Sequence, residues 1–215
     1  MPNERSLAFT LMTLTASDLS PRQQEILDAA RQLFSRQGYP AATMRDLARQ
    51  LGLQPASLYS HYGAKEDMLW EIARRCADEF EAEVAVLADD AAPAPLRLAR
   101  MIGAHLEVMV RNLDAAAIFL HEWIHLGEPH RSIYAARLRA YEAGFECVIA
   151  QGVAEGSFRP VHPRLIAHTL LAALNGIRHS YKSGQDLPPD LVQQQLTQWL
   201  LHGLAAGLPT PTPDR

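Results

Sequence analysis

The chain has 215 residues, of which 48% are hydrophobic and 20% charged, and its formal net charge is -4. These values lie close to the averages of soluble globular proteins and argue against a disordered chain. No apolar run approaches the roughly 18 residues that a membrane-spanning helix requires, which argues against an integral membrane protein. The two cysteines, Cys76 and Cys147, lack the spacing of a redox or zinc motif, so a reducing cytoplasm is the expected localisation.

The charges are unevenly distributed along the chain. Residues 20–75 carry eight Lys or Arg and six Asp or Glu, whereas residues 76–215 carry eleven basic and sixteen acidic residues. The N-terminal segment is therefore the expected nucleic-acid face. Before it, the apolar stretch LAFTLMTLTAS at 7–17 follows an n-region without net positive charge, so we expect residues 1–19 to be a flexible arm rather than a signal peptide.

The apolar residues recur at helical spacing with no sustained alternation of the kind found in strands, which predicts an all-α protein. The first helix begins after Ser20, because Gln23 three residues later completes a capping box, and Gly38 ends it. Thr43 and Asp46 mark the start of a second helix over 44–51. A glycine turn and Pro55 then lead into a third, short helix. Two short helices joined by a glycine turn are typical of a helix-turn-helix.

A long amphipathic helix over 65–87 follows, and Pro93 and Pro95 interrupt the helical pattern in the stretch 88–95. Later helices are expected at about 95–111, 114–126, 130–154, 163–182 and 189–206. We therefore expect a DNA-binding domain with its linking helix at 20–85, a larger effector-binding and dimerisation domain at 86–208, and a tail at 209–215.

The second helix of a helix-turn-helix lies in the major groove of DNA, where small and hydroxylated side chains suit a close approach. Base contacts are expected from polar or small residues of this helix, namely Gln54, Ala56, Ser57 and Ser60. Phosphate contacts that set the register are expected from Thr43, Tyr59, His61 and Lys65, and Arg45 completes the DNA-binding set.

The stretch AATMRDLARQLGLQPASLYSHYGAKEDML resembles the DNA-binding domain of the TetR/AcrR family of bacterial regulators. The family pattern is matched by Thr43, Leu47, Ala48, Gly52, Leu58, Tyr59, His61, Tyr62, Lys65, Glu66 and Leu69. Three residues depart from it: Tyr62 replaces the usual Phe, Ser60 a common Tyr, and Ala64 the Ser that usually caps the next helix. The resemblance implies a homodimeric, ligand-responsive transcription factor, most often a repressor that a small molecule releases from a palindromic operator.

A dimer is also expected on physical grounds, because one helix-turn-helix offers little surface and two copies about 34 Å apart read successive major-groove faces. In the family the last two long helices form a four-helix bundle with the partner. Two apolar stripes are the candidates for this interface: Ile166, Leu170, Leu174 and Ile177, and Val192, Leu196, Trp199 (or Leu200) and Gly203. The alternative is that both stripes belong to the core of one chain.

The helices between 95 and 182 combine apolar and polar residues in a way that suits a ligand cavity. The candidates are Met101, His105, Met109, Phe119, Trp123, Tyr141, Phe145, Asn175 and Arg178, and the alternative for each is a place in the core. Arg178 and Lys182 either bind an anionic group or favour the helix dipole. The stretches FLHEWIHL, YEAGFECVIAQGVAEGSFRP and AALNGIRHSY resemble regulators that respond to acyl-CoA thioesters, which implies a large anionic effector. No cofactor is expected.

The stretch HEWIH at 121–125 matches the zinc-protease pattern H-E-x-x-H, which raises the alternative of a zinc-dependent hydrolase using His121, Glu122 and His125. The extended metzincin pattern fails, because Gly127 and His130 each arrive one residue early. An accidental match in a helical chain is the preferred interpretation.

In that interpretation Trp123 or His125 faces the pocket or core, and Glu122 is solvated or pairs with a base; no enzyme activity and no metal are expected. A third possibility is an adaptor that uses its helices for protein partners.

Overall fold

The computed structural model describes residues 19–88, 91–182 and 188–205. Within these residues the chain is helical apart from loops and one isolated bridge between Phe158 and Ala205, so the predicted all-α class is confirmed. The helices are α2 (Pro21–Gln37), α3 (Met44–Leu51), α4 (Pro55–Tyr59), α5 (Lys65–Ala88), α6 (Ala94–Arg111), α7 (Leu113–Ala117), η1 (Ile118–Glu122), η2 (Trp123–His125), α8 (His130–Ala154), α9 (Pro163–Lys182) and α10 (Pro189–Leu204). No helix in the described ranges is long and apolar enough to cross a membrane.

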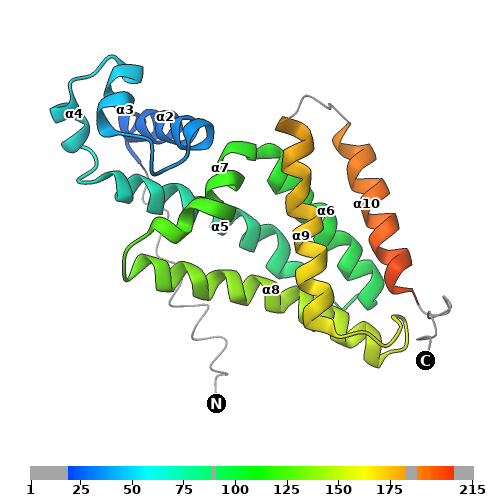
Figure 1. Cartoon of the computed structure of the whole chain (residues 1–215). Coiled ribbons are helices and arrows are strands. Elements are labelled where there is room, and N and C mark those ends of the chain that lie inside the picture. Colours follow the sequence, from blue (N-terminus) through cyan, green and yellow to red (C-terminus); the bar gives the residue numbers. More distant parts are fainter. Residues whose placement is uncertain (1–18, 89–90, 183–187, 206–215) are drawn as a thin grey trace, which may run out of the picture.

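A small N-terminal unit of α2, α3 and α4 packs on the first turns of α5 (Figure 1). The predicted capping box of α2 is present, since Ser20 Oγ accepts from the Gln23 backbone N–H and Gln23 Oε1 accepts from the Ser20 N–H at 3.1 Å. Gly52 adopts the left-handed conformation at φ 64, where a side chain would be strained. The capping box therefore fixes the start of α2, and Gly52 fixes the turn that joins α3 to α4.

In the larger unit α6 and α8 pack against α5, α9 packs against α8 and α6, and α10 packs against α6 (Figure 1). Its core contains buried side chains from all of these helices, among them Val84, Met101, Phe145 and Leu174. The long helix α5 therefore belongs to both units: its N-terminus supports α3 and α4, and its C-terminal half packs in the larger core. A shift of α5 in the larger unit would move the smaller one.

The prediction of one regular α-helix at 114–126 is wrong. The chain forms one α-helical turn in α7, continues as the π-helix η1, and ends in the 3-10 turn η2. A π-helical stretch is rare and is often found at functional sites. The other expected helices begin and end within about two residues of their predicted bounds.

Candidate nucleic-acid interface and effector site

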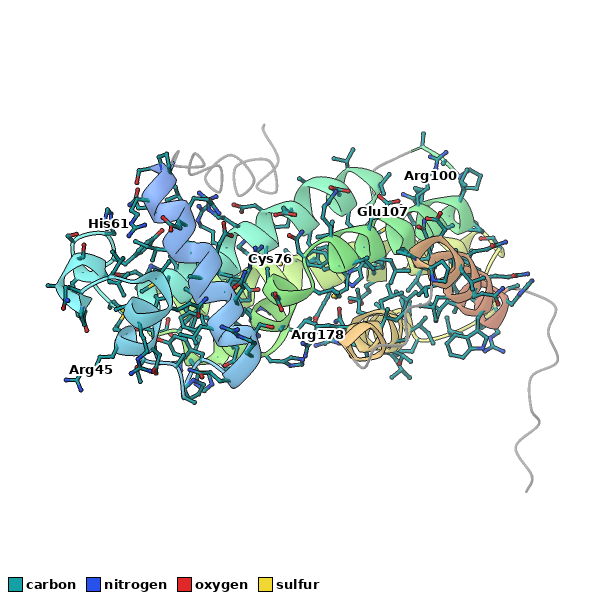
Figure 2. The ribbon with its side chains drawn as sticks, turned by 90° about the horizontal axis from the view of Figure 1, so that it is seen from above. Arg45, His61, Cys76, Arg100, Glu107 and Arg178 are labelled. Atoms are coloured by element: carbon teal, nitrogen blue, oxygen red, sulfur yellow. The ribbon has the colours of Figure 1, made fainter. Side chains whose placement is uncertain are left out.

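Helix α4 presents a polar outer face and is held from beneath by two core side chains. Leu58 is fully buried and Tyr62 nearly so, whereas Tyr59 is 53% exposed. The four predicted base-contacting residues are exposed as well: Gln54, Ala56, Ser57 and Ser60. Figure 2 shows His61 and Arg45 at the outer end of the molecule formed by this unit. The predicted DNA-binding residues of α4 are thus gathered on one accessible surface.

Two predicted contact residues also make local hydrogen bonds. Thr43 Oγ1 donates to Asp46 Oδ2 at 2.6 Å and accepts from the Asp46 backbone N–H at 3.1 Å, and this hydroxyl lowers the pKa of Asp46. Ser60 Oγ donates to the Ser57 carbonyl at 2.7 Å. Each hydroxyl therefore caps or closes a helical turn, and its oxygen can still accept a hydrogen bond from outside.

The side chain of Lys65 is not free at the surface, as a simple phosphate contact would be, but binds within the protein. Its ammonium donates to the carbonyl oxygens of Tyr39 at 2.7 Å and Ala42 at 2.8 Å, and it lies 4.0 Å from the centroid of the Tyr39 ring. Desolvation lowers the pKa of Lys65, with Glu122 partly opposing this effect. The lysine therefore anchors the loop between α2 and α3 to the start of α5, a role that its place in the sequence motif did not reveal.

Four of the predicted effector-binding residues meet in the core of the larger unit. His105 on α6 lies 2.8 Å from the hydroxyl of Tyr141 on α8 through Nδ1, and 3.1 Å from Oδ1 of Asn175 on α9 through Nε2. Because a carbonyl oxygen only accepts, Nε2 carries the proton and Nδ1 accepts from the tyrosine. The rings of Phe80 and Phe145 flank the imidazole, with centroids 4.9 and 6.5 Å away.

This cluster is uncharged. Burial lowers the pKa of His105 to about 4, partly offset by its hydrogen bond to Asn175. Burial also raises the pKa of Tyr141 well above its usual value. The cluster therefore combines hydrogen-bonding groups with aromatic surface while excluding charge.

The other predicted effector residues lie around the cluster or apart from it. Met101 is fully buried in the larger core, whereas Met109 is fully buried in the core that continues into the N-terminal unit. Trp123 is half-buried, with its ring 5.6 Å from that of Tyr134. Arg178 is half-buried on α9 (Figure 2). The side chains of Phe119 and Lys182 lie outside the described residues.

A narrow recess between α5 and α8 reaches the uncharged cluster from the side. It is lined by Ala77, Phe80, Glu81, Tyr134, Arg137, Leu138 and Tyr141, and it is too narrow for a water molecule. Among these lining residues, the buried Arg137 binds Glu81 at 2.8 Å and also Asp78 at 2.6 Å. A ligand that opened this recess would separate α5 from α8.

The single chain itself covers much of the dimer stripe predicted on α9, as the core alternative expects. Leu174 is fully buried and Leu170 is 2% exposed within a single chain, and Ile166 and Ile177 pack against the same core. On α10, Leu196 also packs against this core, as does Leu200, and Val192 is half-buried. Trp199, at 66% exposure, and Gly203 do point outward. An apolar stripe in a sequence does not distinguish a core face from an interface, and here most of the stripe is core.

A different face of α9 and α10 is open in the single chain. On α9 it consists of Leu165, Thr169, Ala172 and Gly176, spaced three or four residues apart, with Leu165 at 63% exposure. On α10 it consists of Leu191, Gln195, Trp199 and His202. We call these residues the outward α9–α10 face. Small residues on such a face let helices approach closely.

The HEWIH stretch faces the N-terminal unit. The ring of His125 stacks on that of Tyr39, with centroids 5.7 Å apart and an interplanar angle of 23°. His125 Nε2 lies 3.6 Å from Glu122 Oε2. Because the chain changes from π to 3-10 geometry within the motif, the two histidines are not one turn apart on a regular α-helix. The described residues contain no group of three or more His, Cys, Asp or Glu side chains that could hold a metal ion.

Further contacts join the same region to the N-terminal unit. Ser35 Oγ donates to Asp114 Oδ1 at 2.6 Å, and the Gly127 backbone N–H donates to Glu66 Oε1 at 2.8 Å. The rings of Trp70 and His130 stack with centroids 4.4 Å apart. We call residues 114–130 the junction segment. Sequence reasoning missed it because each contact joins residues far apart in the chain.

The family of the chain follows from comparison with known proteins. A family model described as "Bacterial regulatory proteins, tetR family" matches residues 26–72, and one described as "Tetracyclin repressor-like, C-terminal domain" matches residues 91–204. The chain belongs to the TetR family. It is a DNA-binding transcriptional regulator, as its sequence predicts, and in this family operator DNA and a second copy of the chain are the partners.

Similar proteins cover nearly the whole chain. It is 30% identical to the HTH-type transcriptional repressor KstR2 of Rhodococcus jostii over 88% of this chain and 94% of that one. The solved structure of the ketosteroid transcriptional regulator KstR2 of Mycobacterium tuberculosis is 28% identical, with a TM-score of 0.81 over 88% of this chain and 98% of that one. AibR, solved with isovaleryl coenzyme A and operator DNA, is 27% identical, with a TM-score of 0.72 over 86% and 98%. These proteins are regulators, and nothing in the comparisons supports the zinc-hydrolase alternative.

Proposed function

We propose that this TetR-family regulator is a cytoplasmic repressor that an acyl-CoA thioester releases from a palindromic operator. The observation that carries the choice of effector is the likeness, over 86% of this chain, to AibR in its complex with isovaleryl coenzyme A and operator DNA. The KstR2 relatives are themselves repressors, which supports the direction of regulation.

The DNA contacts come from the exposed surface of α4 and from its flanks. Gln54, Ala56, Ser57 and Ser60 read base edges, and Tyr59 and His61 contact phosphates. Thr43 accepts from outside while it caps α3, and the exposed Arg45 takes the phosphate role first expected of Lys65. Lys65 acts mainly by holding the loop that carries α3 in place.

The acyl group of the effector enters the recess between α5 and α8 and reaches the uncharged cluster around His105. Placing a charge there without a partner would cost several kcal/mol, so the charged nucleotide end of the thioester stays toward the surface. A neutral thioester carbonyl, in contrast, can exchange hydrogen bonds with Tyr141 or Asn175. The aromatic rings of Phe80 and Phe145 supply the apolar surface that an acyl chain requires.

Opening the recess moves α5, and α5 carries the DNA-binding unit at its N-terminus. The same movement displaces the junction segment relative to the DNA-binding unit, because Tyr39, Glu66 and Trp70 contact this segment directly. Release from DNA then follows as a population shift, provided that the effector binds the opened form more tightly than the closed one.

Binding of the effector to the DNA-free protein tests this proposal. Isothermal titration with isovaleryl-CoA, longer acyl-CoA thioesters and free coenzyme A should show that the thioesters bind more tightly than coenzyme A. The variant Phe145→Ala, which removes apolar surface, should weaken thioester binding and leave coenzyme A binding unchanged. Equal affinity for the thioesters and coenzyme A, or the absence of binding, contradicts the proposed effector class.

A further inference from the structure

A series of ion pairs follows α5 from the recess toward the DNA-binding unit. The charged side chains on α5 are spaced three or four residues apart, so they lie along one side of the helix. Three carboxylates and three guanidiniums take part, and their formal charges cancel. We call these residues the ion-pair network: Glu71, Arg74, Arg75, Asp78 and Glu81 of α5, and Arg137 of α8.

At the recess, the network joins α5 to α8 through Arg137. Its Nε binds Glu81 at 2.8 Å, and its Nη2 binds Asp78 at 2.6 Å. Arg137 and Glu81 both line the recess, and the guanidinium is buried. Because Arg137 is on α8 and both carboxylates are on α5, separating the two helices breaks these ion pairs.

In the middle of the network, each charged group has more than one partner. Arg74 Nη1 donates to Asp78 at 2.7 Å, while its Nε and Nη2 donate to the two oxygens of Glu71 at 3.2 and 2.8 Å. Glu71 Oε1 also accepts from Arg75 Nε at 2.6 Å. The side chains of Glu71 and Arg74 are each 14% exposed, so solvent screens their charges only weakly. A change at one pair therefore affects the next.

At its other end, the network reaches the DNA-binding unit. Arg75 Nη1 donates to Gln24 Oε1 of α2 at 3.4 Å. The hydroxyl of Tyr62, which supports α4 from beneath, donates to the Gln23 carbonyl of α2 at 3.4 Å. Burial raises the pKa of Tyr62 to about 12, and the nearby Glu71 carboxylate adds to this shift. The network thus ends beside the residues that hold α2 and α4.

We propose that the ion-pair network holds the recess closed and the DNA-binding unit in place, and that the effector releases DNA by withdrawing Arg137 from it. The inference rests on the proposed function, in which the opened recess belongs to the DNA-free form. Without Arg137, the part of the network on α5 carries a net charge of -1. Arg74 is then drawn toward the two carboxylates that Arg137 has left and away from Glu71. The contact of Arg75 with α2 weakens in consequence.

Two methionine variants test the network from opposite ends. Arg137→Met changes the recess, and Arg75→Met changes the end beside α2. Without effector, each should weaken binding to DNA from the protein's own upstream region about tenfold. Each should also tighten binding of isovaleryl-CoA to the DNA-free protein, because both favour the opened form. A merely structural defect would weaken both kinds of binding.

Arg139→Met is the matched control, since it makes the same change at an exposed site on α8 and should leave both affinities unchanged. The double variant of Arg137→Met and Arg75→Met should bind DNA about as well as either single variant, because both changes interrupt one network. Circular dichroism shows whether each variant folds. If Arg137→Met does not fold, Glu81→Gln takes its place and should shift the two affinities in the same directions.

Unchanged DNA binding by the variants at either end, or losses that simply add in the double variant, overturns the proposal. So does tighter DNA binding, which would mean that the network stabilises the released form. If no acyl-CoA thioester binds the unchanged protein, the proposed effector class fails. The DNA affinities of the variants, measured without effector, still decide whether the network holds the DNA-binding unit in place.

Discussion

His125 of the junction segment stacks on Tyr39 of the loop that precedes α3, with the two ring centroids 5.7 Å apart. The ammonium of Lys65 lies 4.0 Å from the centroid of the same tyrosine ring and binds the backbone of the same loop. One aromatic side chain therefore connects the larger unit, the start of α5 and the loop that positions the helix-turn-helix. The stretch that imitates a zinc-protease motif is, in the folded chain, a contact with the DNA-binding unit.

The first prediction concerns this contact. His125→Ala and Tyr39→Leu should each lower the coupling free energy between effector and DNA by about 1 kcal/mol, because an aromatic pair contributes about 0.5–1.5 kcal/mol beyond its buried area. Effector affinity in the absence of DNA should stay unchanged. The coupling is measured as the ratio of effector affinities with and without operator DNA. The exposed neighbour Ile124→Ala is the control, and additive effects of the two variants would show that the rings do not act as a pair.

The second prediction distinguishes Lys65 from Arg45. Lys65→Met leaves the Tyr39 and Ala42 carbonyls without their partner, so it should destabilise the protein by about 1–3 kcal/mol and weaken binding to all DNA. Arg45→Gln should leave stability unchanged and reduce the slope of log affinity against log salt by about one unit. Chemical denaturation and salt titrations measure the two effects. A full-unit change of slope in Lys65→Met at unchanged stability would restore the simple phosphate role for that lysine.

The third prediction follows from the low pKa of His105. Its pKa in the folded state is about 4, below the usual value of about 6.5, so the unfolded chain binds a proton in this range that the folded chain excludes. Stability should therefore be unaffected above about pH 6.5 and fall by up to about 1.4 kcal/mol per unit between about pH 6.5 and 4. In His105→Gln this share of the pH dependence should be missing. If the stability of the two proteins changed with pH by the same amount across this range, the buried neutral state of His105 would be contradicted.

The fourth prediction concerns the dimer. Ala172→Arg places a charge on the outward α9–α10 face and should convert the protein to a folded monomer with weakened operator binding. Glu107→Lys, a charge change at an exposed site on α6, is the control and should leave the dimer intact. Sedimentation analysis and circular dichroism measure assembly and folding. A stable dimer of Ala172→Arg would place the interface elsewhere.

The sequence predicts well the features that local chemistry determines. Ser20, Thr43 and Gly52 act within three or four residues of their own positions, and their roles as caps and turn residues can be recognised without a structure. The helix-turn-helix motif can also be recognised from the sequence, because its core and surface residues alternate along two short helices. Of the predicted effector residues, His105, Tyr141, Phe145 and Asn175 do meet in one cluster.

Other features depend on contacts between distant residues. The apolar stripe through Leu174 has the same spacing whether a partner or the chain itself covers it, and α8 and α9 pack too closely to leave it open. The change from α to π geometry at Ile118 has no local signal, and Lys65 resembles a surface lysine until the folded loop brings two carbonyl oxygens to it. Long-range packing decides each of these cases.

Binding to DNA from the protein's own upstream region, followed by fluorescence anisotropy near physiological salt, tests the central claim most directly. The account predicts nanomolar binding to this fragment, much weaker binding to a scrambled fragment of equal composition, and release of the specific complex by acyl-CoA but not by coenzyme A. Equal affinity for the two fragments, or a specific complex that acyl-CoA leaves intact, would contradict it.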